Sequence, residues 1–524
     1  MPEGYLSLVL HAHLPYVRHK DEDHFIQERW FFEALTECYL PLVDHLNQIN
    51  DDGLFFRLTL SISPPLAAMF SDDLLSKKFI RYLDNLHSLA DAEIQRTKNE
   101  PQFNSLAHMY RDRFERVYKI YNKYDRNMLN AFKQLQGYGC VELITSGATH
   151  GYFPLLSEQP ETVRAQIQQA IQFHEENFGS RPPGFWLPEC GYYPGVDQYL
   201  ASEGIKYYFL DSHGLLFARP RPRYGTFAPI ETPWGCSAFA RDLETSKQVW
   251  SADDGYPGDY DYREYYRDIG YDLDWSYIKH FVYHNQPTHT GIKYYRITGK
   301  SDHKEPYNPS WAQNKAAIHA DNFLFNRQCQ AKHLNKDMER PPIIVSPYDA
   351  ELFGHWWYEG PQWLDYLIRK TVCDQESIQL ITPGDYLKLY PHNQEAVPCQ
   401  SSWGNEGYSA VWLEQGNEWI YRHLHRAGRQ MVSMVAELPN AKGWTKKALD
   451  QASRELMLAQ ASDWAFIMKT GTLVDYAQER TKKHLDNFSS IHNQVKSGRI
   501  NKKWLNEIAE ENNLFPTIDY RLYQ

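Results

Sequence analysis

Seven short apolar runs, each ending at a polar or turn residue, constrain the fold of this chain more than any other feature. They are continuous rather than alternating, which is typical of parallel strands buried on both faces. Helical patterns such as those of 161–178 and 360–370 lie between them. We therefore predict a parallel α/β barrel with an active site at the strand carboxyl ends. Because the sequence does not show the eight strands of a regular barrel, an irregular barrel is favoured. The runs are LSLVL, LFFRLTLSI, VELIT, GFWLP, KYYFL, IIVSP and IQLIT.

Two regions depart from this repeat. Residues 71–138 are charged and helical without a strand pattern, which predicts a helical insertion; residues 396–524 predict a C-terminal helical domain. The barrel would then comprise 1–70 and 139–395. The predicted C-terminal helices cover 417–437, 446–469 and 474–495. The stretch 250–314 is dense in Tyr, Asp and Gly, and a segment this long within a compact domain is usually functional.

Charge and cysteine usage exclude several classes of protein. A net charge of −11 disfavours a nucleic-acid partner, which needs a basic footprint. The apolar run near the start is too short for a signal peptide, and no stretch approaches the ~20 apolar residues of a membrane span. Seven cysteines without CxxC spacing suit a reducing compartment. We expect a soluble, cytoplasmic protein without nucleic-acid or membrane partners.

Aromatic residues are abundant in a polar chain: 37 Tyr and 15 Trp accompany a mean hydropathy of −0.63. Many must belong to a large core. Tyr and Trp also pair a flat apolar face with a polar edge, which complements a sugar ring. Composition alone leaves core packing and carbohydrate binding open.

Two carboxylates follow predicted strands and are candidates for chemistry. Glu189 lies in WLPECGYYPG, and Asp349 lies in IIVSPYDAELFGHWWYEG, where Glu351 competes for the same role but is farther from the strand end. Paired carboxylates cleave glycosidic bonds with retention when one attacks the anomeric carbon and the other protonates the leaving oxygen. We expect burial against Trp356 and Trp357 to keep the acid protonated. The alternative is that Glu189 is a buried structural residue whose carboxylate is bonded by the backbone or by an arginine.

His11 and His13 form an HxH pair after the first run, and side chains at i and i+2 of a strand share a face. Three roles are open for them: binding sugar hydroxyls, ligating a metal ion, or packing in the core with their ring nitrogens hydrogen-bonded. In the metal alternative, His150 and Asp349 would complete a site of the kind a deacetylase uses.

Tryptophans supply candidate sugar platforms, although core packing is the ordinary role of any single one. Gly and Ser around two of them, in SSWGNEGYSAVW, favour an exposed loop. The candidates are Trp30, Trp275, Trp403 and Trp412.

Six segments in order resemble a known family. HAHLPY at 11–16, GATHGYFP at 147–154, WLPECGY at 186–192, ARD at 240–242 with VWS at 249–251, and YDAELFGHWW at 348–357 resemble the five motifs of glycoside hydrolase family 57. ELMLAQASDWAFIM extends the resemblance over nearly the whole chain.

The resemblance implies an incomplete (β/α)7 barrel with an inserted helical domain and a C-terminal helical domain. It implies Glu189 as nucleophile, Asp349 as acid/base, and no metal or other cofactor. The length and the SSWG…W segment look most like the 1,4-α-glucan branching enzymes, which act on α-1,4-glucan donor and acceptor chains. Matching positions imply glucan contacts by His11, His13, Trp30, His150, Arg241, Trp275, Trp356, Trp403, Trp412 and Asp463.

One departure concerns the balance of transfer and hydrolysis. Branching members often carry a Tyr on a mobile loop that keeps water from the glycosyl-enzyme, but the matching stretch, 234–249, has none. Phe239 is the candidate substitute. An α-amylase or 4-α-glucanotransferase is therefore the main alternative. A metal-dependent deacetylase and an inactive glucan-binding protein are more distant ones.

Overall fold

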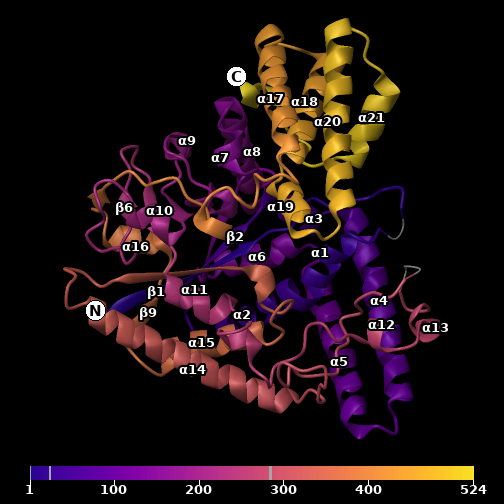
Figure 1. Cartoon of the computed structure of the whole chain (residues 1–524), viewed down its shortest axis with the longest axis vertical. Coiled ribbons are helices and arrows are strands. Elements are labelled where there is room, and N and C mark those ends of the chain that lie inside the picture. Colours follow the sequence, from indigo (N-terminus) through magenta and orange to yellow (C-terminus); the bar gives the residue numbers. More distant parts are fainter. Residues whose placement is uncertain (1, 23–24, 283–285) are drawn as a thin grey trace.

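Seven parallel strands form the centre of the fold (Figure 1). The computed structural model describes residues 2–22, 25–282 and 286–524. Neighbours pair in the order β7-β5-β4-β3-β2-β1-β8, which brings the carboxyl ends of these strands to one edge. The strands are β1 (Gly4–Ala12), β2 (Leu58–Ile62), β3 (Val141–Ser146), β4 (Gly184–Trp186), β5 (Tyr207–Leu210), β7 (Ser237–Ala240) and β8 (Ile343–Asp349).

The barrel is incomplete. Within the described ranges, β7 and β8 form no ladder, although the Asp242 N–H donates to the Val345 carbonyl at 2.8 Å. A short β6 (Ile230–Glu231) pairs antiparallel with β7 and parallel with β10 (Gln394–Glu395). β9 (Ile378–Leu380) pairs with the start of β1. The predicted fold class, an incomplete α/β barrel, is confirmed.

The apolar runs located most strands correctly because both faces of each strand are covered. Every residue of β1 and β2 is buried. Among the seven parallel strands the exception is β7, whose sequence SAFA is too short and too rich in small residues to be recognised as a strand. It completes the set of seven parallel strands.

Helices surround the sheet and connect its strands. The two predicted examples are present as α8 and α15, and α8 ends at Gly179, whose φ of +76° gives the left-handed cap that glycine favours. The main helices of the barrel are α1 (Glu28–Ala34), α2 (Leu40–Asp51), α3 (Pro64–Phe70), α7 (Phe153–Leu156), α8 (Pro160–Phe178), α9 (Val196–Ser202), α10 (Ser212–Leu216), α11 (Leu243–Trp250), α14 (Pro309–Leu334), α15 (Gly360–Cys373) and α16 (Pro383–Leu389).

The stretch predicted as an insertion is helical. It holds α4 (Asp73–Arg96), α5 (Pro101–Lys123) and α6 (Met128–Gly137), and α4 and α5 lie side by side in Figure 1. α4 begins where the Asp72 side chain accepts a hydrogen bond from the Leu75 N–H, an N-cap that fixes its first turn.

The C-terminal region is also helical, and α17, α18, α20 and α21 gather at the top of Figure 1. The single helix predicted for 446–469 is wrong: it is broken at Ala461, which is extended and bridges to Gly151. The break separates α18 from a short α19. The limits of the three domains remain predictions. The helices are α17 (Trp419–Glu437), α18 (Gly443–Ala459), α19 (Ser462–Thr470), α20 (Val474–Ser497) and α21 (Lys502–Glu511).

The stretch 250–314 is largely irregular in its described part. It contains two four-residue helices, α12 (Ile269–Asp272) and α13 (Trp275–Ile278), before α14 begins. Across the described part of the chain, no helix combines the length and apolar character that crossing a bilayer requires.

Candidate active site

A cavity of about 470 Å³ opens at the carboxyl ends of the strands. Strand register explains part of its composition: His11 on β1 lies opposite Ser61 on β2 and opposite Asp349 on β8. The predicted residues that line it are His11, His13, His150, Glu189, Arg241, Asp349, Trp403, Trp412 and Asp463, joined by Trp250, Glu351, Gly404, Asn405, Val411 and Phe466.

Glu189 is held firmly at the floor of this crevice. It follows β4 in a single 3₁₀ turn and has a φ of +60°, a left-handed conformation that is strained for a residue with a side chain. Its two carboxylate oxygens accept separate hydrogen bonds, one from Trp403 Nε1 and one from Ser462 Oγ, both at 2.9 Å. Removal from bulk water raises the pKa of Glu189, and these two bonds oppose the rise. The carboxyl group is oriented from two sides.

Asp349 ends β8 and faces the same crevice. Removal from bulk water raises its pKa well above the usual range, and the neighbouring carboxyls of Glu351 and Glu189 raise it further. Such a shift favours the protonated form of the carboxyl group. Glu351 has other partners, since its Oε1 accepts hydrogen bonds from the His13 N–H and the Tyr39 hydroxyl. Of the two acids, Asp349 is therefore the better candidate proton donor.

His11 and His150 form a hydrogen-bonded chain that ends on the candidate nucleophile. His11 Nδ1 contacts Ser61 Oγ at 3.0 Å, His11 Nε2 contacts His150 Nε2 at 3.0 Å, and His150 Nδ1 contacts Ser462 Oγ at 2.9 Å. An ionised Glu189 only accepts, so the Ser462 proton points toward it. Each earlier group then donates in turn, from Ser61 through the two histidines to Ser462.

Neutral imidazoles suit this chain. Burial lowers the pKa of both His11 and His150 well below the usual value, and the neighbouring His13 lowers it further. A neutral ring has one donor and one acceptor nitrogen, which is what each position in the chain needs.

His13 is different. Its Nδ1 contacts Ser63 Oγ at 2.8 Å, and its Nε2 lies 3.2 Å from the Asp463 carboxylate. Burial lowers the pKa of His13, but Asp463 outweighs burial and raises it overall. The HxH pair does point into the crevice, as its strand spacing predicted. In the described residues, no group of three or more His, Cys, Asp or Glu side chains is arranged to hold a metal ion.

Arg241 enters the crevice from the end of β7. Its Nη2 is 2.6 Å from Asp211 Oδ2, which anchors the guanidinium, while its buried Nε has no hydrogen-bond partner among the described residues.

The tryptophans divide into two groups. Trp403, which is half-buried, and Trp412 line the cavity. The prediction that Trp412 lies exposed on a loop is wrong. Its ring is 1% exposed and stacks on Tyr152 with centroids 4.4 Å apart. The other three, Trp30, Trp275 and Trp356, are not among the residues that line the cavity. Their substrate contacts remain predictions.

Trp356 also differs from its expected surroundings. It was expected to bury the acid, but its side chain is 56% exposed and stacks on Tyr265. Trp357 is buried at 1% exposure. The raised pKa of Asp349 follows from its own burial and from nearby carboxyls instead.

Phe239 does not replace the missing loop tyrosine. It lies inside the barrel on β7, 1% exposed, against Phe209 and Tyr207. The aromatic residue that reaches the crevice from this part of the chain is Trp250, at the end of α11.

Several residues of the site escaped sequence reasoning. Ser61 and Ser63 repeat at the end of β2 the i, i+2 spacing that the two histidines have at the end of β1, a signal that was available. Ser462 and Tyr39 gave no such signal, because Ser462 becomes visible only once the helix predicted across it is seen to break. Tyr39 lies on a buried π-helix (Leu35–Tyr39).

An open parallel barrel whose crevice pairs two carboxylates with histidines and indole rings defines an enzyme of glycosidic-bond chemistry. The family model described as Glycosyl hydrolase family 57 matches residues 7–398, and the model described as 1,4-alpha-glucan branching enzyme, C-terminal, matches residues 423–523. The chain belongs to glycosyl hydrolase family 57, which confirms the resemblance.

Individual relatives carry two kinds of name. A 1,4-alpha-glucan branching enzyme of Thermococcus kodakarensis is 32% identical, over 98% of this chain and 77% of that protein. A branching enzyme from Pyrococcus horikoshii is 32% identical with a TM-score of 0.90, covering 99% of this chain and 97% of that one. An alpha-amylase from Thermotoga maritima is 43% identical with a TM-score of 0.93, covering 100% of this chain and 99% of that one.

Proposed function

We propose that this chain is a retaining 1,4-α-glucan branching enzyme, which cleaves an α-1,4 linkage and transfers the released chain to a 6-hydroxyl of an acceptor glucan. Glu189 would be the nucleophile and Asp349 the acid/base.

One contact carries the proposal. Ser462, at the start of α19, donates a hydrogen bond to Glu189 at 2.9 Å. Ser462 lies within the stretch that matches the branching-enzyme C-terminal model, whereas Glu189 lies within the stretch that matches the family-wide model. The segment typical of branching enzymes therefore takes part in the candidate catalytic centre.

The two carboxyl groups that line the crevice would supply each step of a double displacement. Glu189 attacks the anomeric carbon while Asp349 gives its proton to the leaving glycosidic oxygen, which forms a covalent glycosyl-enzyme. The ionised Asp349 then takes the proton of the acceptor hydroxyl as that oxygen attacks the anomeric carbon and displaces Glu189. Two inversions retain the α configuration.

His11, His13, Arg241 and Asp463 would hold the sugar at the cleavage point, since all four line the cavity. Trp403 would stack on a sugar ring and also orient Glu189, because its Nε1 donates a hydrogen bond to the carboxylate. Trp250 would cover the site in place of the tyrosine that 234–249 lacks.

An α-amylase is the second candidate, favoured by the 43% identity to the Thermotoga maritima protein and by the absence of that tyrosine. Water and an acceptor chain compete for the same glycosyl-enzyme, so both outcomes need only one set of catalytic groups.

Proton NMR of the products formed from amylose separates the two. A branching enzyme produces new α-1,6 anomeric signals, and an amylase produces reducing ends without them. Branch signals that stay absent at full amylose conversion would reject the leading proposal.

We further propose that the donor and acceptor are glycogen-like chains and that the protein works in the cytoplasm. All seven cysteines are free, and the charge of −11 does not favour polyanions. Fractionation of the source cells, with glycogen branch analysis after gene deletion, tests both points.

A further inference from the structure

The buried π-helix that joins α1 to α2 has no role in the mechanism described so far. Three consecutive residues of this helix, Glu37, Cys38 and Tyr39, bond to the loop that follows β8, and we call them the π-helical clamp. We propose that Tyr39 is a positioning residue for the acid/base, because the clamp fixes this loop and the Tyr39 hydroxyl holds the Glu351 carboxylate beside Asp349. The inference rests on the proposed function for the role of Asp349.

The π-helix has a local cause in the sequence. Pro41 comes two residues after it, and proline has no N–H to donate to the carbonyl four residues earlier, which is that of Glu37. The Leu40 N–H bonds instead to the carbonyl of Leu35, five residues back, as in a π-helix. The Glu37 carbonyl accepts a hydrogen bond from Arg113 Nη2 of α5 at 3.2 Å. A helix of the predicted insertion therefore helps to hold the clamp in place.

The clamp bonds the loop at its first two residues, Ala350 and Glu351. The Cys38 thiol donates a hydrogen bond to the Ala350 carbonyl at 2.9 Å, and the Tyr39 hydroxyl donates to Glu351 Oε1. Burial and the nearby Glu351 raise the pKa of Tyr39 well above the usual value, so the hydroxyl keeps the proton that it donates. Because these two loop residues directly follow Asp349, the clamp fixes the backbone that leaves the acid/base.

The clamp also holds the loop farther along, where His355 Nδ1 donates a hydrogen bond to Glu37 Oε2 at 2.8 Å. Burial raises the pKa of Glu37, but the hydrogen bond and the charge of His355 outweigh it and lower the pKa to about 2. The preceding residue, Gly354, has a φ of +109°, and a Cβ there would lie 1.9 Å from the Glu37 carbonyl oxygen. Only glycine permits this close approach of loop and helix.

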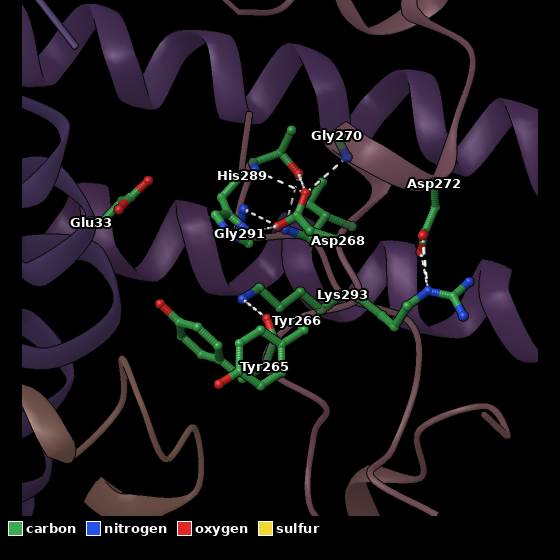
Figure 2. A network of polar contacts seen from close by, with 12 residues as sticks. Glu33, Tyr265, Tyr266, Asp268, Gly270, Asp272, His289, Gly291 and Lys293 are labelled. Atoms are coloured by element: carbon green, nitrogen blue, oxygen red, sulfur yellow. Dashed lines mark hydrogen bonds and ion pairs between the residues drawn. The ribbon is translucent and has the colours of Figure 1, made fainter. Parts of the chain in front are cut away.

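The irregular stretch before α14 supports His355 from another side. The Tyr265 hydroxyl contacts His355 Nε2 at 3.3 Å, and Lys293 donates a hydrogen bond to the Tyr265 carbonyl. Figure 2 shows Lys293 beside Tyr265, together with the fully buried Asp268, whose carboxylate accepts a hydrogen bond from the Gly291 N–H at 2.9 Å. These bonds join two distant parts of the stretch, so the loop after β8 is held by the clamp and by a second bonded segment.

The clamp acts on the acid/base through the charge of Glu351. Burial raises the pKa of Glu351, and the hydrogen bond from Tyr39 is the largest effect that opposes this rise. Burial also raises the pKa of Asp349, and Glu351 is the neighbour that raises it most. The other titratable or charged groups near this pair are His13, Cys38, Glu189 and Arg241. Tyr39 therefore helps to keep the charge on Glu351 and the proton on Asp349.

The pH profile of amylose cleavage tests the proposal. Tyr39→Phe removes one hydroxyl, so the pKa of Glu351 should rise and that of Asp349 should fall. The alkaline limb of kcat/KM should then move to lower pH by about one unit. Glu351→Gln removes the charge itself and should shift the limb in the same direction. In the double variant the second substitution should add no further shift, because both act through one carboxylate.

Tyr307→Phe is the matched control. The buried Tyr307 hydroxyl donates a hydrogen bond to Oε1 of Glu359, also buried, at 2.6 Å, but Glu359 is not among the residues that line the crevice. The control should lower the melting temperature about as much as Tyr39→Phe and keep the alkaline limb of the wild type.

Three results would overturn the positioning role: an unmoved alkaline limb in Tyr39→Phe, an equal shift in Tyr307→Phe, or shifts that add in the double variant. If Tyr39→Phe does not fold, the Glu351→Gln profile decides, and an unmoved limb there overturns the proposal.

This outcome is distinguishable from that of the proposed function. Cleavage is measured as loss of α-1,4 linkages, which does not depend on whether branches form, and Asp349→Asn on aryl glycosides first shows whether the alkaline limb belongs to Asp349. If the limb persists in that variant, the acid/base assignment fails and the positioning role fails with it. If the limb disappears there but stays unmoved in Tyr39→Phe, only the positioning role fails.

Discussion

The barrel half and the C-terminal half of the crevice place their side chains in different ways. On the barrel side, Asp349 and His11 lie on paired strands, so the register of the sheet decides that they face each other. On the C-terminal side, Ser462 reaches Glu189 only because Ala461 breaks a helix and bridges to Gly151. The groups assigned to bond chemistry lie at the strand ends, Asp349 at the end of β8 and Glu189 in the turn that follows β4. The Ser462 hydroxyl that orients Glu189 comes from the helical C-terminal region instead.

The largest expected effect is on the barrel side. Glu189→Gln should lower activity on amylose by roughly a thousandfold or more, because the amide has the same shape but is a far weaker nucleophile. The melting temperature should stay close to that of the wild type. Residual activity of more than a few per cent would place the nucleophile elsewhere.

Asp349→Asn should slow turnover of amylose by about 10²–10⁴-fold, the usual contribution of a general acid. The loss should be smaller for aryl glycosides whose leaving group needs no proton. Because the pKa of Asp349 is raised, wild-type activity should be lost as pH rises through it. That alkaline decline should be absent from the variant on activated substrates; an unchanged pH profile would reassign the acid.

Trp412→Ala should mainly affect stability. The ring is buried on Tyr152, and truncation of such a residue costs roughly 3–5 kcal/mol of unfolding free energy. Trp403→Phe, which keeps a ring but removes the N–H bonded to Glu189, should lower activity with little change in stability. Denaturant unfolding and kinetics of both variants check this assignment. A Trp412→Ala variant that keeps its stability but loses activity, with a destabilised but active Trp403→Phe variant, would contradict it.

Ser462→Ala measures how much the hydrogen bond from the C-terminal half to Glu189 contributes to activity. Loss of a hydrogen bond to a charged group costs about 1.5–3 kcal/mol, so kcat/KM should fall about tenfold or more. The bond opposes the raised pKa of Glu189, so its loss should move the acidic limb of the pH profile upward by about one unit.

Ser433→Ala is the control for Ser462→Ala. Ser433 donates a bond of the same 2.9 Å length to Glu437, but on the exposed surface of α17. A fall in kcat/KM without any shift of the acidic limb would mean that Ser462 is merely structural.

Removal of metal should have the smallest effect. The HxH histidines are engaged by Ser61, Ser63 and Asp463, so activity should be unchanged after prolonged EDTA dialysis. Stoichiometric zinc by elemental analysis, with activity lost on its removal and restored on its return, would support the deacetylase-like alternative instead.

Much of the barrel was predictable because buried parallel strands must be continuously apolar. The runs before His11, Glu189 and Asp349 located three strands of the site, together with the residues that follow them. The strand β7 was not predictable, since SAFA has neither length nor bulk to mark it. Nor was the burial of Trp412, because loop composition describes the backbone and not the ring that packs against it.

The sequence by itself determined which side chains stand at the strand ends, because a strand is a local pattern and its last residue is known when the pattern ends. It also determined the family, through six short motifs in order. Only the tertiary structure decided how these residues act together: that His11 and His150 bond to each other, that Ser462 orients Glu189, and that Trp356 stacks on Tyr265. The reason is physical. Each of these contacts joins residues more than 90 positions apart, and the distance between such residues is set by packing rather than by any local preference of the chain.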